Sequence, residues 1–304
     1  MSDVTVRVLT RSPSLLPLYA RALASGVPVV SSLPGLQRRP AVPAGAGELA
    51  TVALERPGVA IGADHLSDYR QVCGFAFRES VPSTYPHVLA FPMHLAVLTD
   101  PGFPFGAMGL VHIASSISQL KRIDPADRID LHVHAAEVAA HPRGIQVTLV
   151  SEARVDGELV WRDDTMLLHR GGDGSGLGSA APVEGLPEQA PRGSVTWRLP
   201  GGLGRRYASV SGDRNPIHLY DVTAKMFGYP RHIAHGMWTT ARCLAELENR
   251  LPQRYAVSVA FKRPVLLPGE VTFGMREDGH RVEFAVTSAD GSTTHLLGNV
   301  TPLP

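Results

Sequence analysis

The chain has 304 residues, of which 44% are hydrophobic and 19% charged, a composition typical of globular proteins and unlike that of disordered or fibrous chains. Its 29 basic and 28 acidic residues leave a net charge of +1, so no overall positive field favours nucleic acid. Two cysteines, Cys73 and Cys243, are too few and too far apart for a disulfide framework or a CxxC metal site. The first ten residues lack the basic and apolar regions of a signal peptide, and the apolar stretch around 88–98 is too short to span a bilayer. We therefore predict a soluble cytoplasmic protein that binds neither nucleic acid nor membranes.

In the first half of the chain, helices are predicted before strands. Residues 13–25 are expected to form a helix that Gly26 ends, and a second helix is expected over 64–72. Strand patterns follow at 145–153 and 159–168, and the turn between them carries the Asp-Gly pair typical of a β-hairpin. This order predicts an α+β unit.

A stretch rich in Gly and Pro, residues 171–193, follows these strands. A structureless loop of this length is unusual inside one compact domain. We therefore predict that it is a linker between an N-terminal domain, 1–170, and a C-terminal domain, 194–304.

The second half repeats the order of helices and then strands. Asp221 is expected to cap a short helix over 222–227, and a longer helix is expected after His235. The longer helix has an apolar stripe at helical spacing, which predicts one buried face: Met237, Ala241, Leu244 and Ala245. Strand patterns at 281–288 and 293–300 are again joined by an Asp-Gly turn.

Short patterns also recur between the halves. Residues 110–130 and 256–271 both show a strand pattern, then a basic pair, then a turn with proline. The pattern Tyr69…Cys73-Gly74 likewise resembles Tyr207…Ser211-Gly212. We interpret the chain as two copies of one α+β unit.

The polar residues between 207 and 238 suggest a chemistry. Asp213 and His218 are five residues apart, so a regular helix would separate them by about 140°, whereas a turn at Asn215-Pro216 folds them toward one point. An Asp and a His together commonly hold and activate water, and a free His titrates near about pH 6.5. A helix that begins near Gly236 would add free N–H groups and a partial positive charge, which suit a thioester oxygen that becomes enolate-like.

This segment resembles the MaoC-like, or hydratase-2, family of hotdog-fold enzymes. The matching residues are Tyr207, Ser211-Gly212-Asp213, Asn215-Pro216-Ile217-His218, Ala224, Gly228 and Ile233-Ala234-His235-Gly236-Met237. The resemblance is strong over this motif, extends to the rest of the second half by element order, and is weak over the first half. It implies an α+β double hotdog, in which each copy has a long helix wrapped by an antiparallel sheet. It also implies the activity of a (3R)-specific enoyl-CoA hydratase or 3-hydroxyacyl-thioester dehydratase in fatty-acid metabolism.

The resemblance assigns roles to single residues. Asp213 and His218 would form the catalytic dyad, Asn215 would orient their loop, and the Gly236 N–H would bind the thioester oxygen. In the first half, Phe75 follows Cys73-Gly74 where an acid would be expected. That half is therefore expected to accommodate the acyl chain rather than to do chemistry.

Substrate binding is predicted at four further residues, each with a structural alternative. Ser211 and His235 either contact the substrate or support the loop and helix. Lys262 and Arg263 either bind the phosphates of coenzyme A or form a solvated strand end. No spacing of residues indicates a metal or a redox cofactor, so none is expected.

Two other functions remain open, a hotdog thioesterase and a non-catalytic module that binds acyl thioesters. The Asp-Arg-Asn-Pro-Ile-His spacing favours the hydratase over the thioesterase, and the intact pair of Asp213 and His218 argues against the binding module. The partner is expected to be an enoyl or 3-hydroxyacyl thioester of coenzyme A or of acyl-carrier protein, and the sequence favours neither carrier. A monomer and a homodimer both fit a chain that already contains two hotdogs.

Overall fold

The computed structural model describes residues 6–26 and 52–304, with only the backbone for 24–26. The prediction that the first ten residues are not a signal peptide falls partly on residues 1–5, which lie outside the described residues. The chain forms two compact units, and neither is a contiguous half of the sequence. Unit 1 contains residues 1–60, 89–113 and 128–182, and unit 2 contains 61–88, 114–127 and 183–304. The division of the sequence into copies around 171–193 remains a prediction.

Unit 1 is built on a five-stranded arrangement in the order β1 (Val6–Val8), β2 (Ala53–Ala60), β4 (Arg128–His141), β5 (Gly144–Val155) and β6 (Glu158–Arg170). All neighbours are antiparallel except β1 and β2. The Asp-Gly turn between β5 and β6 is confirmed as a hairpin, with φ of 49° at Asp156 and 82° at Gly157. These positive φ values match the right-handed twist of the strands, which is why Asp-Gly is favoured there.

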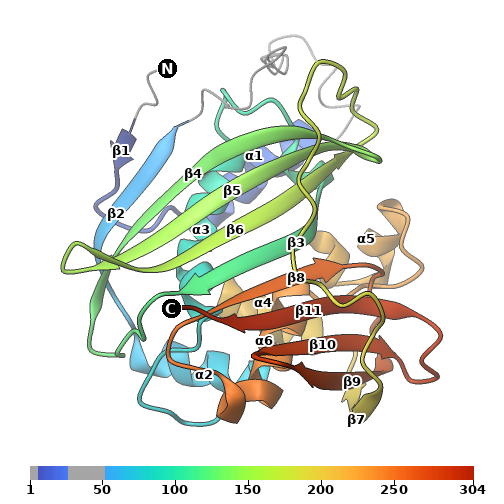
Figure 1. The fold of residues 1–304 in the computed structure, drawn as a ribbon. Helices are drawn as coiled ribbons and strands as arrows, with labels where there is room; N and C mark the ends of the chain where they lie inside the picture. Colours follow the sequence, from blue (N-terminus) through green and yellow to red (C-terminus); the bar gives the residue numbers. More distant parts are fainter. Residues whose placement is uncertain (1–5, 27–51) are drawn as a thin grey trace. The chain divides into compact units, whose positions relative to one another are not determined.

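The helices of unit 1 are α1 (Leu15–Gly26) and most of α3 (Tyr85–Leu98), with a short 3-10 turn, η1 (Ala107–Gly109). The predicted helix over 13–25 is confirmed as α1. Helix α3 (teal in Figure 1) is apolar on most of its surface because it is buried, and it packs on α1 through Leu95, Leu18 and Ala22. His94 of α3 bonds to Ser151 of β5 across 2.6 Å, so the helix is also tied to the sheet.

The sheet of unit 2 has the order β3 (Leu110–Gln119), β8 (Tyr255–Phe261), β11 (Thr294–Pro302), β10 (Arg281–Ser288), β9 (Gly269–Asp278) and β7 (Gly193–Leu199). Every neighbouring pair is antiparallel, and β3 enters the unit at Ala114. The strands predicted at 281–288 and 293–300 are confirmed as β10 and β11.

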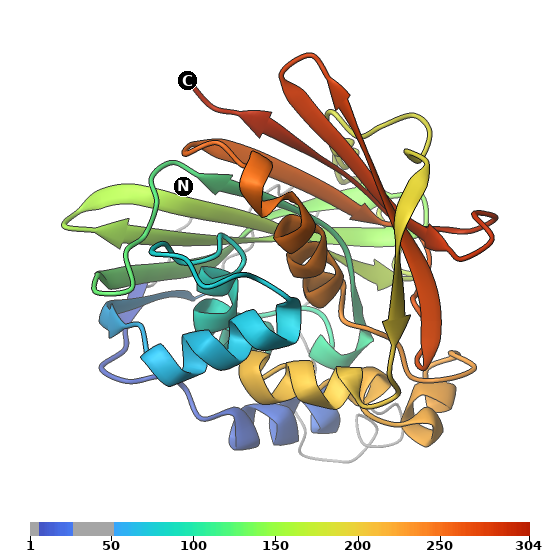
Figure 2. The ribbon, with the colours of Figure 1, turned by 90° about the horizontal axis from the view of Figure 1, so that it is seen from below.

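The helices of unit 2 are α2 (Ala63–Cys73), α4 (Leu203–Ser211), α5 (Asp221–Met226) and α6 (Gly236–Leu247), with 3-10 turns η2 (Pro216–His218) and η3 (Glu248–Arg250). Figure 2 shows α6 lying against the strands of this unit. Three members of its predicted apolar stripe are buried, Met237, Ala241 and Leu244. Each unit thus combines a buried helix with an antiparallel sheet, and the fold is the expected α+β double hotdog.

The helices at 64–72 and 222–227 also form, with one difference in detail. Helix α5 begins at Asp221 itself, and Tyr220 occupies the N-cap position without a side-chain cap. The Asp221 carboxylate instead accepts a hydrogen bond from the backbone N–H of His232. The sequence predicted that Asp221 would cap the start of this helix, but in the structure its carboxylate binds a backbone N–H eleven residues further along the chain.

The Gly- and Pro-rich connection from β6 to β7 is held by individual hydrogen bonds to strands rather than by a helix or strand of its own. In unit 1, Ala140 of β4 donates to Gly178 and accepts from Ala180. In unit 2, Asn299 of β11 donates its side-chain amide to the carbonyl of Glu184. Across the described part of the chain, no helix has the length and apolarity needed to cross a membrane.

Candidate active site

The loop after α4 is shaped by three side chains that each accept a backbone N–H two residues further on. Ser211 accepts from Asp213 at 3.1 Å, Asp213 from Asn215 at 3.0 Å, and Asn215 from Ile217 at 3.3 Å. Gly212 ends α4 in the left-handed region with φ of 74°, which a side chain would disfavour. The dense turn formers of the sequence therefore build one continuous bend, and the short helix η2 begins at its end.

His218 lies at the end of η2 and is 8% exposed. Its Nδ1 is 2.8 Å from the carbonyl oxygen of Ile233. Because a carbonyl only accepts, Nδ1 carries the proton of the neutral ring, and Nε2 keeps its lone pair. The backbone around Ile233 thus selects the tautomer in which His218 can act as a base through Nε2.

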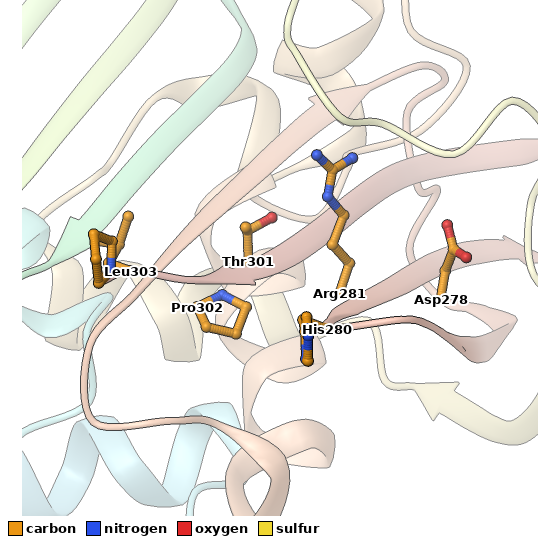
Figure 3. Close-up of a pocket in the computed structure, with 7 residues that line it drawn as sticks. Asp278, His280, Arg281, Thr301, Pro302 and Leu303 are labelled. Atoms are coloured by element: carbon orange, nitrogen blue, oxygen red, sulfur yellow. The ribbon is translucent and has the colours of Figure 1, made fainter.

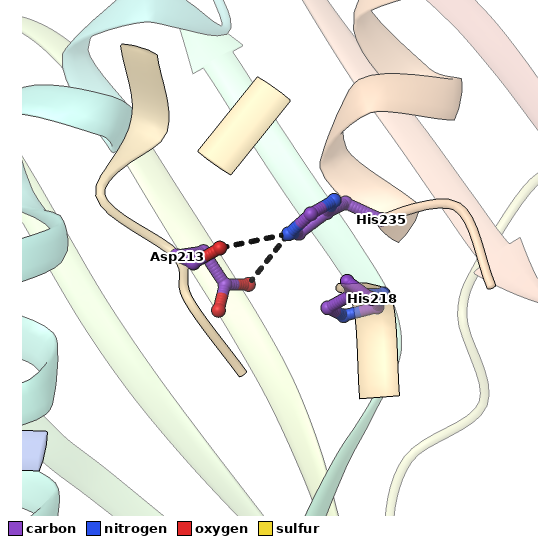
Figure 4. Close-up of side chains that lie close together, drawn as sticks. All are labelled: Asp213, His218 and His235. Atoms are coloured by element: carbon purple, nitrogen blue, oxygen red, sulfur yellow. Dashed lines mark hydrogen bonds and ion pairs between the residues drawn. The ribbon is translucent and has the colours of Figure 1, made fainter. Parts of the chain in front are cut away.

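His235 immediately precedes α6, and its ring stacks on that of His218 with centroids 3.7 Å apart (Figure 4). Its Nε2 donates to the backbone carbonyl of Asp213 at 2.9 Å and lies 3.7 Å from the Asp213 carboxylate. Its Nδ1 is buried without a hydrogen-bond partner. A bare ring nitrogen in this position costs about 1–3 kcal/mol of desolvation, so this residue does not serve stability alone.

The three side chains come together although they are far apart in sequence. One oxygen of Asp213 and one ring nitrogen each of His218 and His235 lie within 4.8 Å of one another. Two histidines and a carboxylate are a known metal donor set, but the His235 nitrogen next to the Asp213 carboxylate, Nε2, carries a proton that it donates to a carbonyl and so has no lone pair for a metal. The Asp213 carboxylate and His218 Nε2 remain as a pair suited to hold a water molecule.

The surroundings set the charge state of this pair. Burial raises the pKa of Asp213, but His235, His218 and the Asn215 N–H outweigh it, so the pKa is lowered overall. Burial lowers the pKa of His218, and the Asp213 carboxylate only partly opposes this. Burial, with His218 beside it, lowers the pKa of His235 to about 3. At neutral pH the cluster therefore holds one carboxylate and two neutral imidazoles.

Gly236 is the first residue of α6, so its N–H has no acceptor within the helix. A Cβ at this position would lie 2.8 Å from the ring of Phe261, the last residue of β8. A side chain here would force the Phe261 ring to shift, so close packing favours a glycine, a reason that the sequence did not indicate. Lys262 and Arg263 follow Phe261 directly, beyond the end of β8, and are both exposed.

Two further residues help to assemble the site. Gly204 of α4 packs so closely on η2 that an added Cβ would lie 2.0 Å from the carbonyl oxygen of His218. His232 bonds through its two ring nitrogens to Asp221 and to the carbonyl of Gly201. The sequence could have pointed to Gly204, because an isolated glycine inside a helical pattern often marks close packing.

Helix α2, which comes from the first half of the sequence, contacts α4 in unit 2, directly before the loop that carries Asp213. His65 bonds to the Tyr85 hydroxyl and to the carbonyl of Val210 in α4. Tyr69 and Tyr207, matched to each other by the sequence repeat, are both buried with ring centroids 6.4 Å apart. Where the second copy has an acid, Phe75 stacks against Tyr69 at 6.3 Å.

A hollow of about 570 Å³ lies elsewhere on unit 2 (Figure 3). It is lined by Asp278, His280, Arg281 and the last four residues of the chain, Thr301, Pro302, Leu303 and Pro304. Thr301 is at the end of β11 opposite to Leu296, which pairs with Phe261 beside α6. Five residues of strand separate the two ends by roughly 17 Å, so this hollow is distinct from the Asp213 and His218 site.

The residues 185–297, which include this whole cluster, match the family model described as MaoC like domain. The chain is also 33% identical over 288 residues to 3-hydroxyacyl-thioester dehydratase X of Mycobacterium tuberculosis, covering 95% of this chain and 98% of the relative. The chain belongs to the MaoC-like dehydratase family. A shorter match, 40% identical over 63 residues, joins 19% of this MaoC-like chain to 40% of a 3-hydroxybutyryl-CoA dehydratase of Methylorubrum extorquens.

Solved structures of MaoC-like proteins have the same fold. The crystal structure of HtdX of Mycobacterium tuberculosis matches with a TM-score of 0.73 and 32% identity, over 83% of this chain and 100% of that one. A MaoC-like dehydratase from Phytophthora capsici matches with a TM-score of 0.69 and 18% identity, over 84% and 98% of the two chains, which bears on the fold alone.

Proposed function

We propose that this MaoC-like protein catalyses the reversible hydration of trans-2-enoyl thioesters to (3R)-3-hydroxyacyl thioesters. The observation that carries the proposal is the convergence of the Asp213 carboxylate and the ring of His218, whose Nε2 is unprotonated, together with His235 at the start of α6. Membership of the family supports the reaction type, and relatives named as dehydratases of 3-hydroxyacyl thioesters support the substrate class.

In the proposed mechanism, Asp213 and His218 hold one water molecule between them. His218 Nε2 takes a proton from the water as its oxygen bonds to C3, and the π electrons of the C2–C3 bond move toward the thioester carbonyl. The Gly236 N–H stabilises the enolate oxygen, a contribution of about 3–4 kcal/mol in analogous sites. The imidazolium of His218, beside the Asp213 carboxylate, then returns the proton to C2, and dehydration follows the same path in reverse.

Binding of the carrier is assigned to residues around this centre. We place the phosphates of the carrier near Lys262 and Arg263, because both are exposed beyond the end of β8 and directly follow Phe261. Ser211 supports the loop through its bond to the Asp213 N–H, which favours the structural alternative for this side chain.

A cytoplasmic location is proposed because the thiols of Cys73 and Cys243 are both free and buried. A monomer and a homodimer are both compatible with two hotdogs in one chain.

The test is hydration of crotonyl-CoA and of a longer trans-2-enoyl-CoA, followed by loss of the enoyl absorbance and by resolution of the product's stereochemistry. We expect (3R)-3-hydroxyacyl-CoA to accumulate without release of free thiol. Release of thiol from an acyl-CoA would instead identify a thioesterase. A lack of turnover with CoA and carrier-protein substrates alike would favour a non-catalytic binding module.

His235 is proposed to position Asp213 rather than to contact the substrate, because its Nε2–H holds the Asp213 carbonyl. Replacement by Leu removes this donor, and we expect kcat to fall roughly 10- to 100-fold with little change in KM. His235→Gln, which carries a side-chain N–H of similar reach, should recover part of kcat. Steady-state kinetics and a melting curve for each variant check this. Equal losses in both variants, or losses that follow Tm, would argue for a merely structural role.

The charge states predict the pH dependence of the reaction. Because the pKa of His218 is lowered below the ordinary value of about 6.5, the base stays unprotonated below that pH. Activity should therefore persist as the pH falls through about 6.5 and be lost only at lower pH, when His218 takes up a proton. A profile of kcat/KM between about pH 4.5 and 8 measures this acid limb in the free enzyme. A limb at or above about pH 6.5 would contradict the assigned environment.

A further inference from the structure

Helix α5 carries an unusual concentration of exposed apolar side chains. Tyr220, Val222, Met226 and Phe227 are 56%, 74%, 80% and 38% exposed. They lie within eight residues, and among the described residues of unit 2 the other large hydrophobics this exposed are Phe77 and Val195. Val222 and Met226 are four apart on the helix, so they share one face. Burial of this face by a partner would remove apolar surface from water.

Basic residues flank the same face. The guanidinium of Arg205 lies over the ring of Tyr220 at 5.4 Å, and Lys225 lies on α5 between Val222 and Met226. We call these two residues, with Tyr220, Val222, Met226 and Phe227, the α5 patch. Tyr, Phe, Met and Arg are the residue types that protein interfaces enrich.

The charge around the α5 patch is positive in an otherwise slightly acidic chain. Residues 203–231 contain five basic residues and two acidic ones, Asp213 and Asp221, which gives this segment a net charge of +3. Since the whole chain carries +1, the remainder carries −2. Asp213 belongs to the catalytic pair, and Asp221 is engaged by His232. The patch therefore presents an apolar face flanked by Arg205 and Lys225, and Asp221, which binds His232, is the acidic residue of α5. The net charge of this segment stays positive, which complements an acidic partner.

Short hydrogen bonds connect α5 to the segments that hold His218. Thr223 of α5 donates to the carbonyl of Pro216 in η2 at 2.6 Å. Asp221 accepts from the His232 N–H at 3.0 Å, and the next residue, Ile233, supplies the carbonyl that fixes His218 Nδ1. Figure 2 shows α5 at the edge of the unit, following α4 along the chain. A partner on the α5 patch would thus contact a helix that is hydrogen-bonded to both segments that position His218.

We infer that the α5 patch docks an acidic carrier protein that delivers the acyl thioester on its flexible prosthetic arm. The inference rests on the proposed function and names its substrate carrier. A free coenzyme A thioester has phosphates to match the positive charge, whereas the four exposed apolar side chains on and beside α5 are better matched by a protein surface, which covers apolar area as well as charge. The expected partner is a small helical protein with carboxylates around an apolar centre.

The test compares the same trans-2-enoyl chain attached to acyl-carrier protein and to coenzyme A, with the full-length enzyme. In a Val222→Glu/Met226→Glu variant we expect kcat/KM for the carrier-protein substrate to fall roughly 10- to 100-fold, with coenzyme A kinetics within about twofold. Lys225→Glu should lower the carrier-protein rate and its dependence on salt in the same direction. Val195→Glu, a matched change at an exposed position of β7, should leave both substrates unaffected.

Three results would overturn the inference. The first is turnover of enoyl-CoA by the wild type with no use of the carrier-protein substrate, which leaves the hydratase function intact. The second is an equal effect of the patch variants on both substrates, or no effect on either. The third is binding of the wild type to vesicles of anionic phospholipid, lost in Val222→Glu/Met226→Glu with unchanged carrier-protein kinetics, which would assign the α5 patch to a membrane surface.

Discussion

Asp213→Asn is expected to lower kcat for hydration by roughly 10²- to 10⁴-fold, the range in which positioned acid–base groups contribute. The substitution removes the negative charge that, in the proposed mechanism, orients the water and stabilises the imidazolium of His218. The amide oxygen of Asn can still accept the Asn215 N–H that Asp213 binds at 3.0 Å, so the loop should keep its shape. The enoyl absorbance measures the rate, and a melting curve should show nearly unchanged stability.

The chain offers a matched control for this change. Asp290 accepts the N–H of Ser292 in the hairpin between β10 and β11, which is the same local arrangement on the surface. Asp290→Asn should leave kcat unchanged. If Asp213→Asn retained wild-type turnover, or lost activity only because it unfolded, the assigned role of the carboxylate would be wrong.

Gly204→Ala is expected to damage both stability and activity. The new Cβ would lie 2.0 Å from the His218 carbonyl oxygen, a backbone atom that cannot rotate away. We expect a loss of about 1–3 kcal/mol in the free energy of unfolding, as for other overpacked cores. Because η2 must move to relieve the clash, kcat should also fall, and a displacement of about 1 Å is enough for roughly 10²-fold. Urea unfolding and steady-state kinetics measure the two effects.

Gly202→Ala is the control for this prediction. Gly202 precedes the same helix, has φ of −83°, and would place its Cβ no closer than 3.8 Å to the mobile end of Arg205. This variant should differ from the wild type by less than about 0.5 kcal/mol. Equal behaviour of the two alanine variants would show that the contact between α4 and His218 does not constrain the site.

The sequence by itself determined the elements whose cause is local. The Asp-Gly pair at 156–157 predicted a hairpin because its backbone tolerates positive φ, and structure and pattern agree there. The stripe of Met237, Ala241 and Leu244 predicted the buried face of α6 because helical spacing is fixed. The turn formers around Asn215 likewise predicted that Asp213 and His218 approach each other.

The tertiary structure alone decided which distant groups complete the site. The tautomer of His218 depends on the carbonyl of Ile233, and the place of His235 depends on the carbonyl of Asp213. A Cβ at position 236 would meet the ring of Phe261, and one at 204 would meet the backbone of His218, in contacts between segments 14 to 25 residues apart. Such pairings leave no periodic pattern in the sequence, because each depends on how separate elements pack. The sequence could therefore indicate Asp213 and His218 as candidate residues, whereas the packing of α4, η2 and α6 set their protonation and orientation.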